Sequence, residues 1–214
     1  MNIKVLGATL GAVAIGLSVS VAPSEAAVFN NSTGLTNPGT TLTFNEVPLS
    51  NGTPVTNQYA GFGVNFTGLF YNPENFSAPN ISSPTLGNFD FISLPNPLFS
   101  IKFLQQQTAA AFAMITNPGS STFTALLNGS AVESFSASTD YASSNNFYGF
   151  TNILFDEVQV SAGGSNNAAL IDNLQFNSSA TAVPTPALLP GLIGMGIAAY
   201  RKRKGEGVEQ PSEA

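Results

Sequence analysis

Short runs of alternating apolar and polar residues recur along the middle of the chain and predict β-strands. Side chains on successive strand residues point to opposite faces, so this alternation is typical of a strand with one buried face. Asn, Gly, Pro and Ser separate the runs, as expected of turns. The predicted runs are Thr41 to Glu46, Phe62 with Val64 and Phe66, Phe89 with Phe91, Leu98 to Leu104, Asn152 to Ser161, and Ala168 to Phe176.

The clearest local signal is a predicted hairpin around Asn128-Gly129. These two residues stand between the strand-like runs Phe123 to Leu127 and Ser130 to Val132. Asn and Gly both tolerate positive φ, which a two-residue hairpin turn requires.

The run Ala109 to Thr116 leaves two structures open. Its alanine content fits a helix, but Pro118-Gly119 would end that helix early, and strand-like runs flank it. We therefore predict a buried strand. About eight to ten short strands without a convincing helix favour an all-β fold, an antiparallel jelly-roll β-sandwich over residues 27–178.

The N-terminus predicts a secretory signal peptide over residues 1–26. Asn2 and Lys4 form a short basic region, and Val5 to Val21 is apolar. Ser24 and Ala26 are the small residues before a cleavage site after Ala26. An N-terminal membrane helix is the alternative, but no stop-transfer cluster follows the apolar run. The middle of the chain is therefore expected outside the cytoplasm.

The C-terminal residues 179–214 predict a linker followed by a membrane-directed segment. An apolar run of about 14 residues, 187–200, would span roughly 21 Å as a helix, against a hydrocarbon core of about 30 Å. Such a short helix suits a transient hold better than permanent anchoring, although a permanent anchor remains the alternative. The basic residues behind it would stay on the cytoplasmic side. The segment consists of Val183, Pro184, Thr185, Pro186, Ala187, the apolar run, the cluster Arg201, Lys202, Arg203 and Lys204, and an acidic tail from Gly205.

This order of proline-containing motif, apolar helix and basic cluster resembles the PEP-CTERM class of bacterial sorting signals, in the Pro-Thr-Pro-Ala form of cyanobacteria. The resemblance covers about the last thirty residues. It implies cleavage between Pro184 and Ala187 by an exosortase-type membrane transpeptidase. The implied product is an exported protein of the cell envelope, cell surface or extracellular matrix, made through a single-pass membrane precursor.

Composition excludes several functions of the middle segment. Charged residues make up only 8% of the chain, and Lys102 is the single cation between Ala27 and Tyr200. Nothing there could neutralise phosphates, so we expect no nucleic-acid binding. The chain contains no histidine and no cysteine, which removes Ser-His-Asp and Cys-His catalytic systems. A glycosidase carboxylate pair stays formally open, but no tryptophan or arginine would shape its sugar cleft. We predict that the protein is not an enzyme.

Two acids are candidate metal ligands because of their position in the strand pattern. Glu46 shares a predicted strand face with Leu42 and Phe44, and Asp172 shares one with Leu170 and Leu174. A buried carboxylate must be protonated, hydrogen-bonded or matched by a cation. The segment lacks basic partners, so a structural Ca²⁺ bound by oxygen ligands would solve the problem. The alternative is that both acids lie at strand ends and reach water.

A second resemblance concerns the same part of the chain. Phe44-Asn45-Glu46, Gly52 to Val55, Tyr59 to Phe66 and Ile171 to Leu174 are similar to the galactose-binding-like jelly rolls that often precede such sorting tails. That group resembles carbohydrate-binding modules. The resemblance implies a structural calcium that joins an early-strand Glu to a late-strand Asp, here Glu46 and Asp172.

Aromatic residues beside amides are candidates for glycan binding. Sugar sites use aromatic faces for stacking and amides for hydroxyl groups. The alternative is that these rings pack back onto the core. The candidate residues are Tyr71, Phe76, Tyr141 and Tyr148. The sequence thus predicts an exported, non-enzymatic surface or matrix protein. A carbohydrate-binding envelope protein with a defined glycan site is the second hypothesis, and a permanently anchored envelope protein is the third.

Overall fold

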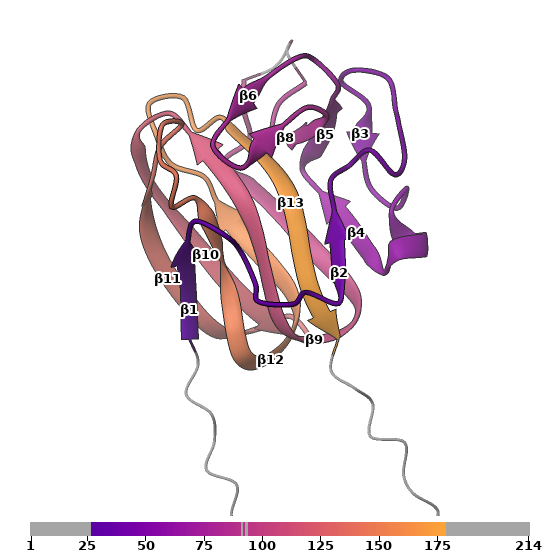
Figure 1. The fold of residues 1–214 in the computed structure, drawn as a ribbon, viewed down its shortest axis with the longest axis vertical. Helices are drawn as coiled ribbons and strands as arrows, with labels where there is room; N and C mark the ends of the chain where they lie inside the picture. The colour runs from indigo at the N-terminus through magenta and orange to yellow at the C-terminus, as the bar shows by residue number, and fades with distance from the viewer. Residues whose placement is uncertain (1–26, 91, 93, 179–214) are drawn as a thin grey trace, which may run out of the picture.

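Antiparallel strands make up nearly all of the regular secondary structure, which confirms the predicted all-β class (Figure 1). The computed structural model describes residues 27–90, 92 and 94–178. The predicted signal peptide, residues 1–26, and the predicted sorting segment, residues 179–214, lie outside the described residues. In the part of the chain that is described, no helix is long and apolar enough to cross a membrane.

Thirteen strands and one short 3-10 helix form the described part. They are β1 (Ala27–Asn31), β2 (Thr40–Leu42), β3 (Pro54–Val55), η1 (Ala60–Phe62), β4 (Val64–Thr67), β5 (Leu69–Asn72), β6 (Ser77–Ala78), β7 (Ile81–Ser82), β8 (Thr85–Gly87), β9 (Leu98–Thr116), β10 (Gly119–Leu127), β11 (Ser130–Thr139), β12 (Phe147–Ser161) and β13 (Ala169–Ser178).

Two long strands, β9 and β12, connect two portions of one large sheet. The second half of β12 pairs with β10 and with the first residues of β9. Its first half pairs with β1 and with the second half of β9. The register shifts between Thr151 and Phe155, next to Asn152, which has a φ of 62°. Such a bulge bends a strand, so β12 can serve both portions.

The strongest sequence signals are confirmed. Asn128 and Gly129 form the two-residue connection between β10 and β11, with φ angles of 52° and 79°. Residues 109–116 form the second half of β9, and every one of them is buried. The alanines are therefore part of a strand that is covered on both faces.

Other predicted strands are shorter than the sequence indicated. The prediction of one strand from Thr41 to Glu46 is wrong. β2 ends at Leu42, and Phe44 has a φ of 61°, which breaks the extended conformation. Phe62 does not share a face with Val64 and Phe66. It ends the helix η1 and is exposed.

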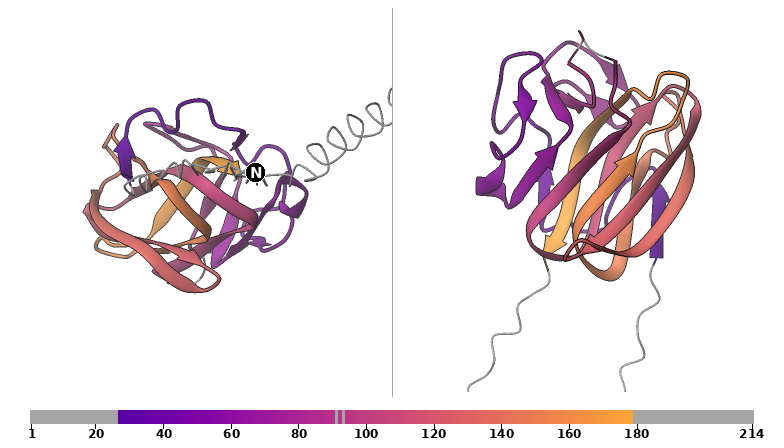
Figure 2. Two further views of the ribbon diagram at one scale, coloured as in Figure 1. Left: turned by 90° about the horizontal axis from the view of Figure 1, so that it is seen from below. Right: turned by 180° about the vertical axis from the view of Figure 1, so that it is seen from behind.

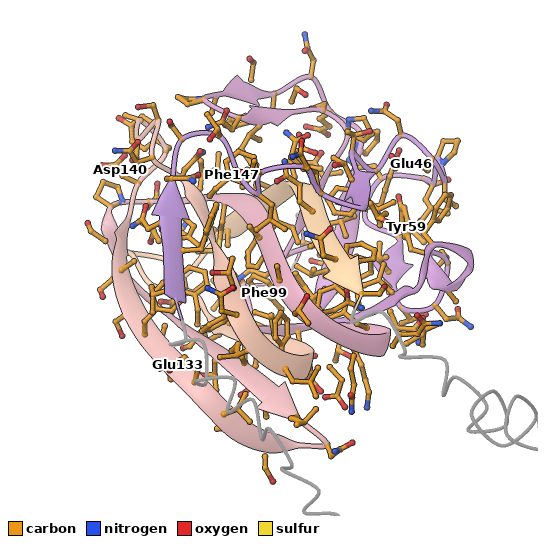
Figure 3. All side chains as sticks on the ribbon, turned by 60° about the horizontal axis from the view of Figure 1, so that its bottom comes forward. Glu46, Tyr59, Phe99, Glu133, Asp140 and Phe147 are labelled. Carbon is orange, nitrogen blue, oxygen red and sulfur yellow. The ribbon has the colours of Figure 1, made fainter. Side chains whose placement is uncertain are left out.

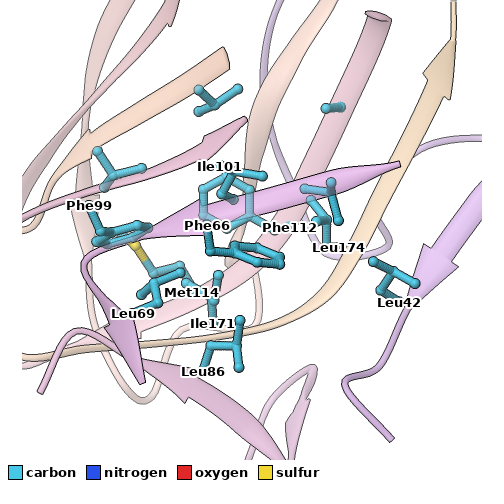
Figure 4. Packing of buried hydrophobic residues seen from close by; sticks show 14 of the residues in the cluster. Leu42, Phe66, Leu69, Leu86, Phe99, Ile101, Phe112, Met114, Ile171 and Leu174 are labelled. Atoms are coloured by element: carbon cyan, nitrogen blue, oxygen red, sulfur yellow. The ribbon is translucent and has the colours of Figure 1, made fainter. Parts of the chain in front are cut away.

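The main core lies between the two portions of the sheet and is rich in phenylalanine (Figure 4). Phe123 stacks on Phe135 and on Tyr148, with ring centroids 4.9 and 4.8 Å apart. Phe44, Tyr59 and Phe66 form a set of edge-to-face contacts near β4. Aromatic pairs of this kind stabilise by about 0.5–1.5 kcal/mol beyond their buried area.

A smaller outer cluster lies on the other face of β9. Along this strand Ala110, Phe112 and Met114 point into the main core, whereas the small residues between them point outward. The β6–β7 hairpin lies near this outward face and contributes Ile81, which is buried. The outer cluster consists of Leu35, Ile81, Ala109, Ala111, Ala113, Ile115 and Phe147.

The two ends of the described chain emerge on the same side of the fold (Figures 1 and 2). Ala27 pairs with Thr151, Thr151 with Ala109, and Ala109 with Asn177, so one row across the sheet holds both ends. We call this side the terminal end. From Ala109 in this row, β9 continues to its last residue, Thr116, about 23 Å away at 3.3 Å per residue. We call that side the loop end.

Candidate functional site

A pocket at the loop end brings together two of the four aromatic residues proposed for glycan binding. Phe76 and Tyr141 both line this loop-end pocket, although they come from distant parts of the chain. Its volume is about 250 Å³. The lining residues are Phe76, Phe89, Ile115, Thr116, Asn117, Tyr141, Ala168, Ala169 and Leu170.

Phe76 is held in place by Ser83. The Phe76 N–H donates to Ser83 Oγ (2.8 Å), and the Ser83 N–H donates to the Phe76 carbonyl oxygen (3.2 Å). These bonds close the base of the β6–β7 hairpin. Phe76 therefore stands at a fixed position where its ring is 37% exposed.

Tyr141 lies in the connection between β11 and β12. Asp140 Oδ1 accepts a hydrogen bond from the Ala142 N–H (2.9 Å), a turn in which an aspartate side chain bonds the backbone two residues further on. Tyr141 lies inside this turn and is 57% exposed. Both exposed aromatic rings thus belong to short segments with defined hydrogen bonds.

Two asparagines join the hairpin to the β11–β12 connection. Asn80 Nδ2 donates to Asn146 Oδ1 (2.8 Å) and to the Ser144 carbonyl oxygen (3.2 Å). Asn146 Nδ2 donates in return to the Pro79 carbonyl oxygen (2.6 Å). Asn146 is fully buried. Because these bonds connect the segment of Phe76 to that of Tyr141, the two walls of the pocket are held relative to each other.

The floor of the pocket is apolar and has one amide at its edge. Ile115 belongs to the outer cluster, and Leu170 packs against it. Asn117 Nδ2 donates to Asn166 Oδ1 (2.7 Å). This bond orients the Asn117 amide and uses only its nitrogen, so the Oδ1 atom is suited to accept a hydrogen bond from a ligand.

The other two proposed glycan-binding residues lie elsewhere. Tyr71 is 2% exposed and belongs to the main core. Tyr148 is completely buried, and its hydroxyl donates to the Ser138 carbonyl oxygen (3.2 Å). Burial, with a smaller contribution from the charge of Asp140, raises the pKa of Tyr148. These two rings pack onto the core, as the alternative interpretation expected. They therefore cannot stack on a ligand at the surface.

Sequence reasoning missed Phe89, Asn117 and the floor residues of the pocket. Phe89 was predicted to continue a strand, but it lies beyond the end of β8. Asn117 follows β9 directly, and only the end point of that strand would have placed it beside Tyr141. The alternating pattern contains no information on which strand ends meet.

Asp172 is buried, as its apolar surroundings in the sequence suggested. It is 1% exposed. Its Oδ2 accepts from the Ser82 N–H (2.9 Å) and its Oδ1 from the Asn173 N–H (2.6 Å). Burial raises the pKa of Asp172 to about 6, the two backbone hydrogen bonds act in the opposite direction, and the charge of Glu46 raises it slightly more.

The predicted face of Asp172 is right with respect to Leu170, which also packs against the outer cluster, but wrong with respect to Leu174 and Phe176. Asp172 pairs with Ala113 of the outer cluster, and directly paired residues share a face. Leu174 and Phe176 point into the main core instead. The register shifts between Asp172 and Gln175, next to Asn173 with a φ of 49°. This bulge reverses the alternation, so the carboxylate lies beneath the β6–β7 hairpin.

Glu46 is exposed and lies beyond the end of β2. Its Oε1 accepts hydrogen bonds from the N–H (2.9 Å) and the hydroxyl (3.1 Å) of Thr43. Glu46 lies on the same side of the fold as Tyr59 (Figure 3). The expectation that it points into the core with Leu42 and Phe44 is wrong, because the strand ends before it.

The residues present fit a calcium ion only in part. The charge of Glu46 affects the pKa of Asp172, so the two carboxylates lie within electrostatic reach. Ca²⁺ needs about 6–8 oxygen ligands, and both Asp172 oxygens already accept backbone hydrogen bonds. Among the described residues, no three acidic side chains gather at one point. The calcium site at Glu46 and Asp172 stays a prediction.

Comparison of the chain with protein-family models, with curated proteins and with solved structures found no match.

Proposed function

We propose that this protein is an exported, non-enzymatic protein of the cell surface or extracellular matrix that binds carbohydrate in its loop-end pocket. The observation that carries this proposal is the meeting of Phe76 and Tyr141 in one pocket, with an amide at its edge. Aromatic rings on an apolar floor with few polar groups are typical of sugar sites. We further propose that the strands form a sandwich of the jelly-roll type.

The size of the pocket suits a single sugar ring. Pockets for drug-sized ligands have volumes of about 300–1,000 Å³, and this one has about 250 Å³. Asn117 Oδ1 would accept a hydrogen bond from a sugar hydroxyl, while Phe76 and Tyr141 would contact the C–H face of the ring. The hydrogen bonds between Asn80 and Asn146 support the proposal, because a preorganised site loses little entropy on binding.

The position of the pocket fits attachment through the C-terminus. β13 ends at the terminal end of the fold (Figure 1), whereas the pocket is lined by residues of the loop end. A chain held at a membrane or envelope through its sorting segment would therefore present the pocket outward. We propose processing after Ala26 and between Pro184 and Ala187, the second step by an exosortase-type transpeptidase.

Binding is tested with the exported protein on an array of polysaccharides, followed by calorimetry. We expect Tyr141→Ala and Phe76→Ala each to weaken binding about tenfold or more, since stacking contacts of this kind contribute about 1–3 kcal/mol in other ring-binding sites. Phe62→Ala is the matched control, because Phe62 is similarly exposed but belongs to η1 and does not line the loop-end pocket. Unchanged glycan binding in both pocket variants would refute the site.

The processing proposal has its own test. The intact mass of the protein from its native host reports both cleavages. A mature protein that retains Arg201 to Ala214 would refute sorting and favour a permanently anchored envelope protein.

A further inference from the structure

We infer that the loop-end pocket prefers a sugar with a free, protonated amine, such as a deacetylated hexosamine unit, over a neutral sugar. This inference rests on the proposed glycan-binding function and adds the class of ligand. The evidence for it is the distribution of charged residues around the pocket.

Acidic residues flank the aromatic walls of the pocket. Glu74 stands two residues before Phe76, Asp90 directly follows Phe89, and Asp140 directly precedes Tyr141. These are three of the eight acids between Ala27 and Ser178. Three different segments thus bring both a ring and a carboxylate to the same end of the fold.

Neutral donors bind two of these carboxylates. Glu74 Oε1 accepts from Asn51 Nδ2 (2.9 Å), and Asp140 Oδ1 accepts from the Ala142 N–H (2.9 Å). Neither donor brings a positive charge to its carboxylate. The residues next in sequence to the aromatic walls of the pocket thus carry formal negative charge.

No basic residue lines the pocket. Lys102, the single cation between Ala27 and Ser178, lies in the first half of β9 and pairs with Glu157 on β12. It is far from the loop end, because Lys102, Glu157 and Leu126 form one row across the sheet, and Leu126 lies near the Asn128-Gly129 hairpin at the opposite end of β10 from Gly119. Uronic acids and sulfated sugars would meet only like charge here.

A protonated amino sugar matches every feature of this pocket. Its ring can stack on Phe76 or Tyr141, and its ammonium group can lie over an aromatic face. The flanking carboxylates of Asp140 and Glu74 would attract the same ammonium group. Asn117 Oδ1 can accept from a ring hydroxyl. An N-acetylated sugar has the ring and the hydroxyl groups but not the charge, so it tests the inference directly.

The test uses tetrasaccharides of β-1,4-linked glucosamine and of β-1,4-linked N-acetylglucosamine, titrated into the exported protein by calorimetry. Short oligomers avoid the many simultaneous contacts of a long polycation. We expect the free-amine form to bind about tenfold more tightly at low salt, with the difference shrinking as salt screens the charges.

Asp140→Asn is the decisive variant. Asparagine keeps an oxygen to accept from the Ala142 N–H, so the turn at Tyr141 is retained while the charge is lost. We expect it to lower affinity for the free-amine form several-fold and to leave the N-acetylated form unchanged. Glu133→Gln is the matched control, since Glu133 lies on β11 toward the opposite end of the strand from Thr139, and Figure 3 shows it well apart from Asp140.

The outcomes separate the inference from the proposed function. Equal affinity for the two tetrasaccharides would overturn the amine preference and leave glycan binding in place. Loss of both ligands in Asp140→Asn would also overturn it, because the residue would then act only on the position of Tyr141. An equal loss in Glu133→Gln would mean attraction by net charge alone and would overturn it as well. Binding of no glycan at all would overturn the proposed function itself.

Discussion

The two outer faces of the sheet differ in how they are covered. On β9, the outward residues Ala109, Ala111, Ala113 and Ile115 are buried under a second layer that includes the β6–β7 hairpin. On β10 and β11 most of the outward residues bear hydroxyl groups and reach water, with Thr122 Oγ1 and Ser136 Oγ 2.9 Å apart. We call the first the covered face and the second the bare face.

This difference explains where the candidate site lies. Small side chains let a second segment approach the covered face closely, and that segment brings Phe76 to the pocket and Ser82 to Asp172. The bare face carries mainly hydroxyl groups, among them the pairs Thr122–Ser136 and Thr124–Ser134, which need no cover. A second layer on one face thus produces both the pocket and the buried carboxylate, and the predictions below test that layer.

The largest effect is expected from Ile81→Ala. Ile81 is 2% exposed and anchors the hairpin in the outer cluster. Truncating a buried isoleucine costs about 2–5 kcal/mol, so urea denaturation should show a loss of this size, together with weaker glycan binding. Val132→Ala on β11 is the control. Val132 is 43% exposed, and we expect a change below about 0.5 kcal/mol. Equal effects would mean that the hairpin adds nothing to the covered face.

Asp172→Asn should stabilise the protein at neutral pH. The pKa of Asp172 is raised to about 6 in the folded protein, from an ordinary value of 3.8. Below pH 3.8 the carboxyl group is protonated in both the folded and the unfolded protein, so it does not change the free energy of unfolding. As pH rises through 6, the folded protein must ionise a buried carboxyl and loses up to about 3 kcal/mol.

The measurement is the free energy of unfolding of both forms from pH 4 to pH 7 in chelator. Asparagine resembles the protonated acid, so the two forms should agree at low pH and diverge toward pH 7 in favour of the variant. A variant that is less stable at pH 7 would show that the ionised carboxylate, through its bonds to Ser82 and Asn173, stabilises the hairpin.

Calcium should raise the melting temperature if it joins Glu46 and Asp172. A site filled to a hundred times its dissociation constant adds about 2.7 kcal/mol, a shift of roughly 5–10 °C. Melts with millimolar calcium and with chelator measure this. Glu46→Gln and Asp172→Asn should each abolish the shift, whereas Glu133→Gln should not. Equal melting temperatures in the unmodified protein would refute the metal.

The sequence predicted the parts of the fold that depend on local chemistry. Asn128-Gly129 identified its hairpin because few other residues adopt positive φ, and the alanine-rich half of β9 was recognised as a buried strand. Predicting which face a residue occupies from the alternation along a strand gave wrong results where the backbone is not regularly extended. Phe44 and Asn173 both have positive φ, and each change reverses or ends the alternation on which the faces of Glu46 and Asp172 were predicted.

The candidate site was only partly predictable for a different reason. Phe76 and Tyr141 were recognisable as aromatic residues beside amides, and so were Tyr71 and Tyr148. What separates the two pairs is burial, which depends on how strands pair over long distances. Tyr71 lies in β5 and Tyr148 in β12, both inside the main core. The pattern of one sequence does not contain these pairings.

The smallest effect is expected on the bare face, from Ser136→Ala. The Ser136 hydroxyl is exposed and pairs with Thr122 Oγ1 across the β10–β11 hairpin. When the Ser136 hydroxyl is removed, the Thr122 hydroxyl can form a hydrogen bond with water instead. The substitution therefore leaves no unpaired buried group. We expect the free energy of unfolding to change by less than about 0.5 kcal/mol, measured by urea denaturation beside Ile81→Ala. A loss comparable to that of Ile81→Ala would mean that β11 is covered in solution. The simplest cover is a second copy of the chain at this free edge of the sheet. The contrast between the two faces would then not hold.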